Sequence, residues 1–206
     1  MSYPRIVVDT NKILAAALKP GRVREMLFNI PAVAITPCEA WREIEKHIGE
    51  LAAKKGVPRD RLEALLDGVR REVIACALPR EPHASTARGI ASGFDPDDWP
   101  FIALALQYNA PIWTNDRGLL RGALHSRRYR ALDTRALDML LEGRDWREVE
   151  EYLRRAYGGR PLGEPRGSGW FAEPLRLPVP PGWCGPVWRD ALSRPPWGVG
   201  PCARRV

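Results

Sequence analysis

The chain has 206 residues, which fits one domain of about 150 residues with an appendage, or two small domains, and excludes a large multidomain enzyme. Hydrophobic residues make up 45% and charged residues 28% of the chain, a balance typical of a globular protein with a buried core, so wholesale disorder is excluded. The net charge of +7 favours a polyanionic partner, with nucleic acid ahead of a membrane surface.

Membrane, export and metal-cysteine signals are absent from the sequence. No apolar run approaches the roughly 20 residues needed to cross a bilayer. Charged Arg5 and Asp9 come early, where a signal peptide would have its apolar core, so we expect a cytoplasmic protein. The four cysteines lack Cys-x-x-Cys spacing and the three histidines do not complete a metal pattern with them. Neither a zinc site nor a disulfide framework is indicated.

Short β-like runs alternate with helical patterns over residues 1–157. The apolar runs predict strands at 6–8, 32–35, 73–78 and 111–114, with an edge strand at 129–132. Helical spacing predicts helices at 12–18, 23–27, 36–51, 58–69, 97–106, 134–141 and 146–157, while 82–94 is ambiguous. Thr36, Pro37 and Glu39 match a capping box at the start of the third helix. Strands separated by helices predict a three-layer α/β/α domain around a central parallel sheet of four to five strands.

Residues 158–206 have a different composition. They contain 10 prolines, 9 glycines and four tryptophans, which is too dense in helix and strand breakers for regular structure. We therefore predict a domain at 1–157 followed by a poorly ordered basic tail. Seven arginines against three acidic residues place more than half of the net charge in the tail. Its tryptophans either stack on bases or pack on the domain, or the tail has little role; these alternatives stay open.

Acidic residues stand where predicted strands stop. Asp9 and Asp116 each follow an apolar run, and ligands of a parallel sheet gather outside the carboxyl ends of its strands. Asp98 opens a helix on the same face as Ile102 and Ala105, which aims its carboxylate toward the sheet. Carboxylates brought together repel one another unless a cation lies between them. The oxygen-rich donor set favours Mg²⁺ or Mn²⁺.

Four short segments that contain acidic residues follow one another along the chain. They are Ile6-Val7-Val8-Asp9-Thr10-Asn11, then Thr36-Pro37 with Arg42-Glu43-Ile44, then Asp95 to Ala105, then Ile112 to Asp116. Over about residues 5–145 this series resembles the PIN-domain nucleases, which include the VapC-type toxins. The resemblance implies that Asp9, Glu43, Asp98 and Asp116 are the catalytic, metal-binding acids. It further implies that Asn11 and Thr114 support them, and that Mg²⁺ or Mn²⁺ is the cofactor.

Each of these acids also has a purely structural reading. Asp9 and Asp116 could cap the helices that follow them, and Asp98 could cap its own helix. Glu43 could be an ordinary surface glutamate, because the apolar face of its helix points away from it. Glu39 is the rival of Glu43, but the capping box already explains it.

The resemblance implies an endoribonuclease that hydrolyses RNA with a metal-activated water, as the toxin of a type II toxin–antitoxin pair. The implied partners are an RNA substrate, a small antitoxin protein and a second copy of the chain in a homodimer, with no membrane. Two alternatives stay open: a PIN nuclease that processes RNA, and a catalytically silent PIN module that binds RNA or protein.

Overall fold

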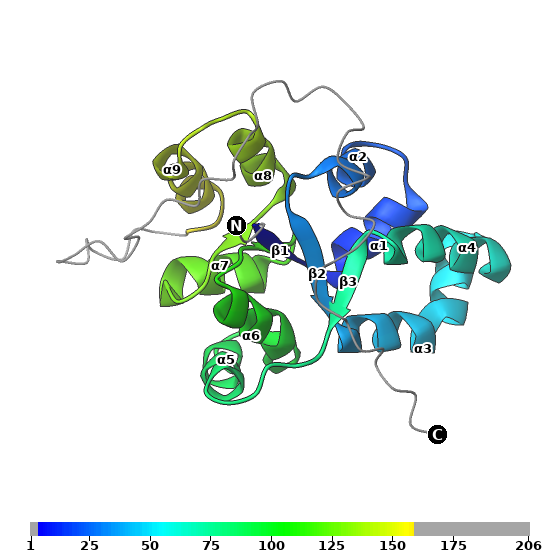
Figure 1. The fold of residues 1–206 in the computed structure, drawn as a ribbon, viewed down its shortest axis with the longest axis horizontal. Coiled ribbons are helices and arrows are strands. Elements are labelled where there is room, and N and C mark those ends of the chain that lie inside the picture. The colour runs from blue at the N-terminus through cyan, green and yellow to red at the C-terminus, as the bar shows by residue number, and fades with distance from the viewer. Residues whose placement is uncertain (1–3, 159–206) are drawn as a thin grey trace.

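A computed structural model describes residues 4–158, in which strands and helices alternate along the chain (Figure 1). The strands are β1 (Arg5–Val8), β2 (Val33–Pro37), β3 (Val73–Cys76), β4 (Ile112–Trp113) and β5 (Ala131–Leu132). The α-helices are α1 (Thr10–Leu18), α2 (Arg22–Asn29), α3 (Cys38–Lys55), α4 (Arg59–Arg70), α5 (His83–Ala91), α6 (Trp99–Tyr108), α7 (Arg117–Ser126), α8 (Thr134–Leu141) and α9 (Trp146–Tyr157). A short 3-10 turn, η1 (Pro96–Asp98), directly precedes α6.

The five strands found within residues 4–158 form one parallel sheet in the order β3-β2-β1-β4-β5. The chain starts at the centre with β1, moves outward through β2 and β3, and then returns to the other side of β1 for β4 and β5. The direction of travel therefore reverses between β1 and β4. In open parallel sheets, this reversal leaves a crevice at the carboxyl ends of the two strands, where ligands bind.

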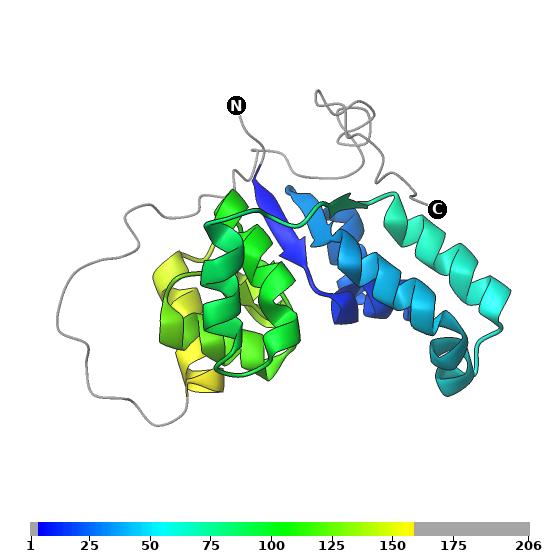
Figure 2. The same ribbon diagram turned by 90° about the horizontal axis from the view of Figure 1, so that it is seen from below.

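Helices cover both faces of the sheet, as right-handed crossovers require. Figure 2 shows the blue to cyan helices of the first half of the chain on one side of the strands and the green helices, α5 to α7, on the other. α6 is the most deeply buried helix, because Phe101, Ile102, Ala103, Leu104 and Ala105 are all buried and the helix packs on β1, β2 and β4. The predicted three-layer α/β/α fold is confirmed.

The predicted capping box at Thr36 is wrong. Thr36 and Pro37 belong to β2, and α3 begins only at Cys38 with no side-chain cap. The Thr36 hydroxyl, which is fully buried, instead donates to the carbonyl of Val8 at 2.8 Å and so joins the carboxyl ends of β2 and β1. Glu39 does not cap the helix and forms an ion pair with Arg42.

The predictions for the tail and for membrane spans concern residues that the structure describes only in part. The predicted tail lies outside the described residues from residue 159 onward. Among the residues that are described, no helix is both long and apolar enough to cross a membrane.

Candidate active site

Asp9 is the first residue after the central strand. It is buried, with 5% of its surface exposed, and its Oδ1 accepts a 3.4 Å hydrogen bond from the backbone N–H of Asn11 as the cap of α1. Its Oδ2 accepts a 2.6 Å hydrogen bond from the Thr114 hydroxyl. Burial raises the pKa of Asp9, against the lowering effect of the Thr114 and Asn11 hydrogen bonds. Both predicted supporting residues therefore contact Asp9.

Asp116 follows β4 on the other side of the crevice. Its backbone N–H donates to the Thr114 hydroxyl oxygen at 2.8 Å, and its Oδ1 accepts from the N–H of Leu119 at 3.0 Å as the cap of α7. Thr114 is fully buried and thus links Asp116 to Asp9 through one hydroxyl. Asp9 and Asp116 do cap the helices that follow them. These capping hydrogen bonds hold both carboxylates at the switch point of the sheet, where the strand order reverses between β1 and β4.

Asp98 has no capping role. Asp95 caps the 3-10 turn by accepting from the N–H of Asp97 at 3.0 Å, whereas Asp98 starts α6 without a side-chain cap. The half-buried Asp98 carboxylate accepts no hydrogen bond from any residue between 4 and 158. Burial, followed by the charges of Asp116, Asp95, Asp9 and Asp97, raises the pKa of Asp98 to about 7. Every charged neighbour that shifts it is another carboxylate.

Two glycines of α7 let the segment before Asp98 approach Asp116. A Cβ at Gly118 would lie 2.9 Å from Asp116 Oδ1 and 3.0 Å from the ring of Phe94. One at Gly122 would lie 2.6 Å from Phe94 and 2.7 Å from the hydroxyl of Tyr129. Because Gly118 and Gly122 are one turn apart, they form a groove in which Phe94 packs. Asp95 to Asp98 follow directly, so this packing brings Asp98 toward Asp116.

Glu43 stands apart from this group. It is exposed on α3 and is absent from the carboxylates that raise the pKa of Asp9 or Asp98. The charges of Asp9 and Asp116 thus act on Asp98 and that of Glu43 does not, but no three acidic, His or Cys side chains of residues 4–158 are arranged to hold a metal ion. The catalytic roles of all four acids stay predictions.

Sequence reasoning missed a buried lysine beside the site. Lys12 is only 1% exposed, and its Nζ donates to Asn115 Oδ1 at 2.7 Å and to Thr134 Oγ1 at 2.5 Å. Burial lowers the pKa of Lys12 to about 8, and the charges of Asp133 and Asp9 oppose that shift. The sequence signal was a lysine directly before the apolar run from Ile13 to Leu18 of α1.

Asp133, directly after β5, is a further acid of this edge; like Asp9 it is buried, and its carboxylate is fully engaged. Its Oδ1 accepts from the N–H of Ala136 at 2.7 Å, and its Oδ2 accepts from the hydroxyls of Tyr152 and Tyr157, each at 2.7 Å. These bonds tie α9 to the start of α8. Asp133 therefore has a structural role, which distinguishes it from Asp98.

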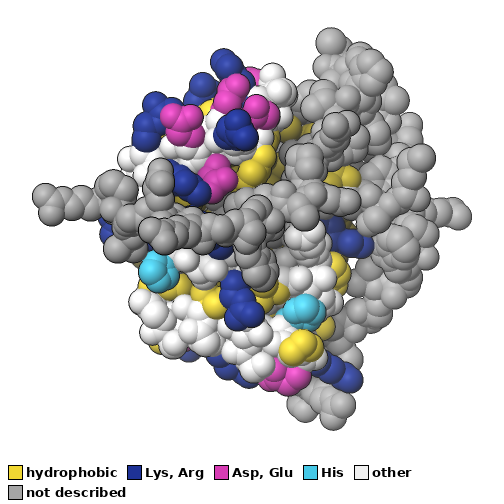
Figure 3. Space-filling view, turned by 90° about the vertical axis from the view of Figure 1, so that its left-hand side faces the viewer, with side chains coloured by type: hydrophobic (Ala, Val, Ile, Leu, Met, Phe, Trp, Pro, Cys, Tyr) yellow, Lys and Arg dark blue, Asp and Glu magenta, His cyan; other side chains and the backbone are white. Residues whose placement is uncertain are grey.

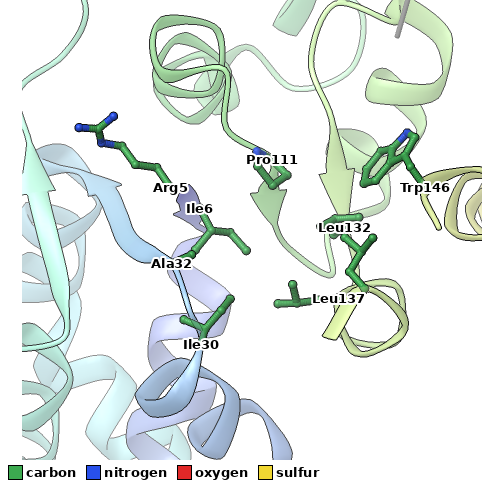
Figure 4. Close-up of a pocket in the computed structure, with 9 residues that line it drawn as sticks. Arg5, Ile6, Ile30, Ala32, Pro111, Leu132, Leu137 and Trp146 are labelled. Atoms are coloured by element: carbon green, nitrogen blue, oxygen red, sulfur yellow. The ribbon is translucent and has the colours of Figure 1, made fainter. Parts of the chain in front are cut away.

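An enclosed pocket elsewhere in the domain gives no competing site. It lies near the amino ends of β2 and β4, next to Ala32 and Pro111, and is lined mainly by apolar side chains such as Ile6, Leu137 and Trp146 (Figure 4). Its volume of about 10 Å³ has room for about one water molecule. It is part of the core packing.

These features define a class of protein: a parallel α/β domain that gathers aspartates at the switch point of its sheet. The sequence model of the PIN domain matches residues 7–152, which is most of the chain and runs from the second half of β1 into α9. The chain belongs to the PIN domain family, whose members are generally nucleases, so a nuclease-type activity is indicated. No curated protein matches the chain.

Proposed function

We propose that this protein is a Mg²⁺- or Mn²⁺-dependent endoribonuclease of the cytoplasm, with Asp9, Asp98 and Asp116 as its metal-binding acids. The observation that carries the proposal is the environment of the Asp98 carboxylate. A half-buried carboxylate without a hydrogen-bond donor, surrounded by like charges, is an unfavourable arrangement that a bound cation would relieve.

The donor set fits a hard divalent cation. Asp98 has two free oxygens within the described residues, and the Thr10 hydroxyl, next to Asp9, is buried there without a hydrogen-bond partner. In the present side-chain conformation, no three His, Cys, Asp or Glu side chains of residues 4–158 are arranged to hold a metal ion. Binding would therefore draw the carboxylates together, and Asp98 is the one without bonds to break. When bound, the cation would supply an acidified water and neutralise phosphate charge for phosphodiester hydrolysis.

A basic helix beside the acids supports a nucleic-acid substrate. α7 begins directly after Asp116, and Arg117, Arg121 and His125 recur every fourth residue, all exposed. No acidic residue occurs between Asp116 and Asp133 in the sequence, and neither Arg117 nor Arg121 forms an ion pair within the described part of the chain. Such a stripe can bind successive phosphates of a strand that enters the site.

Four arginines of α8, α9 and the loop between them are different, because each has a glutamate partner. The pairs are Arg135–Glu142, Arg144–Glu148, Arg154–Glu150 and Arg155–Glu151. On the face shown in Figure 3, basic and acidic side chains are correspondingly interspersed in the upper part. The free charges of α7 are therefore the better candidates for phosphate contacts.

The resemblance of the four acidic segments to VapC-type toxins supports a toxin role, with a small antitoxin protein as inhibitor and a homodimer as the active form. Expression in a host cell tests this role: a toxin arrests growth, and co-expression of an inhibitory antitoxin restores it. An RNA-processing nuclease would leave growth unaffected.

Cleavage of a labelled single-stranded RNA tests the activity itself. We expect cleavage in Mn²⁺ or Mg²⁺ that stops with excess EDTA, resumes when the cation is restored, and leaves 5′-phosphate ends. A DNA oligonucleotide of the same sequence serves as the substrate control. Binding of the RNA without cleavage at any cation concentration would instead favour the silent module.

A further inference from the structure

Lys12 calls for an explanation beyond packing. A buried ammonium group is unfavourable unless it is well paired, and methionine would fill similar space at lower cost. The Lys12 Nζ lies over the Trp113 ring, 5.3 Å from its centroid, and donates to Asn115 and Thr134. Both acceptors lie at the carboxyl edge of the sheet, where the candidate site is.

Lys12 completes a double link across the crevice between β1 and β4. The first link is the 2.6 Å hydrogen bond between Asp9 and Thr114, and the second is the 2.7 Å bond between Lys12 and Asn115. Asp9 and Lys12 are three residues apart at the start of α1, whereas Thr114 and Asn115 are adjacent and lead directly into Asp116. Two links hold the turn in orientation as well as in distance, which one link does not.

We propose that Lys12 is a positioning residue: through Asn115 it fixes the separation of Asp9 and Asp116 and thereby strengthens the binding of the divalent cation. The inference rests on the proposed function, because it assumes that these aspartates bind the cation. Lys12 itself does not contact substrate, since its Nζ is buried and engaged by two acceptors.

The positive charge of Lys12 and its hydrogen bond to Asn115 have opposite effects on cation affinity, so variants can separate them. Loss of a positive charge near Asp9 would strengthen cation binding by Coulomb attraction, whereas loss of the link would weaken it. Asn115→Ala removes the link without changing charge, and Asn115 is exposed, so this variant should fold. Lys12→Met removes both the link and the charge. Lys19→Met, at the exposed end of α1, is the matched control for charge.

The experiment is calorimetric titration of the full-length protein with Mn²⁺. We expect Asn115→Ala to bind Mn²⁺ about 10-fold more weakly, in the range known for residues that orient metal ligands. Lys12→Met should bind more weakly than wild type, the double variant should be no weaker than Lys12→Met, and Lys19→Met should bind like wild type. At saturating Mn²⁺, RNA cleavage by Asn115→Ala should return toward the wild-type rate.

Wild-type Mn²⁺ affinity in Asn115→Ala, or weaker binding by the double variant than by Lys12→Met, would overturn the positioning role while leaving the proposed nuclease intact. If the wild type itself bound no Mn²⁺, the proposed metal dependence would fail and this inference with it. Should Lys12→Met not fold, Asn115→Ala still decides.

Discussion

The Thr114 hydroxyl donates a 2.6 Å hydrogen bond to Oδ2 of Asp9 and accepts the backbone N–H of Asp116, so one buried side chain joins both sides of the switch point. Asp9 is 5% exposed and depends on this donor in the interior of the protein. The same two hydrogen bonds of Thr114 therefore stabilise this edge of the sheet and orient Asp9 and Asp116.

Replacing Thr114 by valine should therefore destabilise the fold. Valine keeps the shape but leaves Oδ2 of Asp9 and the Asp116 N–H without a partner, at an expected cost of about 1–3 kcal/mol in the free energy of unfolding. Urea denaturation at pH 8 measures it. Thr114→Ser, which keeps the hydroxyl, should lose less, and equal losses in the two variants would mean that the methyl group matters more than the bond.

The glycine groove of α7 gives a second prediction. Gly118→Ala or Gly122→Ala would push against Phe94, and overpacking of this kind costs about 1–3 kcal/mol of stability. Because Phe94 precedes Asp95 to Asp98, RNA cleavage should also slow. Gly89→Ala in α5 is the control, since its Cβ would enter open space. Alanine there should be neutral or stabilising, and a similar gain at Gly118 would contradict the proposed packing.

The pH dependence of stability reports on Asp98. Its pKa is raised from 3.8 to about 7 in the folded state, so the folded protein binds the proton more tightly than the unfolded chain. Stability without divalent cations should therefore fall as pH rises from about 4 to about 7. Asp98→Asn should remove this component and unfold at a higher temperature than wild type at pH 8 in EDTA. The exposed Asp67→Asn should keep the wild-type pH dependence; the account of Asp98 is wrong if Asp98→Asn does too.

The basic stripe of α7 is tested by the salt dependence of RNA binding. For single-stranded nucleic acid, each phosphate contact contributes about 0.7 to the slope of log K against log salt. Arg117→Gln with Arg121→Gln should therefore lower the slope by about 1.4, measured by fluorescence anisotropy in EDTA. The control pair, Arg61→Gln with Arg71→Gln, makes the same charge change on exposed residues in and just after α4. Equal slopes in the two double variants would show only a nonspecific charge effect.

Much of the fold is predictable from the sequence, because buried parallel strands leave continuous apolar runs such as Ile6 to Val8. Asp9 and Asp116 are predictable as edge acids for the same reason, since Asp9 directly follows such a run and Asp116 comes two residues after the run from Pro111 to Thr114. Thr36 is misleading because helix caps and strand ends favour the same small polar residues, and only its tertiary bond to Val8 distinguishes them.

Long-range contacts explain what sequence reasoning missed. Lys12 donates hydrogen bonds to residues 103 and 122 positions away in the sequence. The need for glycine at position 118 is visible only in the folded protein, where Phe94 packs against it. Glu43 came from the family resemblance and not from local geometry, and its helix leaves it exposed.

The proposed metal-dependent catalytic centre depends above all on Asp98. The most direct test is the single-turnover rate at which Asp98→Asn cleaves labelled single-stranded RNA in saturating Mn²⁺, beside wild type and Asp67→Asn. Because loss of a metal ligand should cost more than the roughly 10- to 100-fold typical of outer residues, we predict at least about 100-fold slower cleavage by Asp98→Asn, with Asp67→Asn unchanged. Cleavage by folded Asp98→Asn at the wild-type rate would contradict the claim.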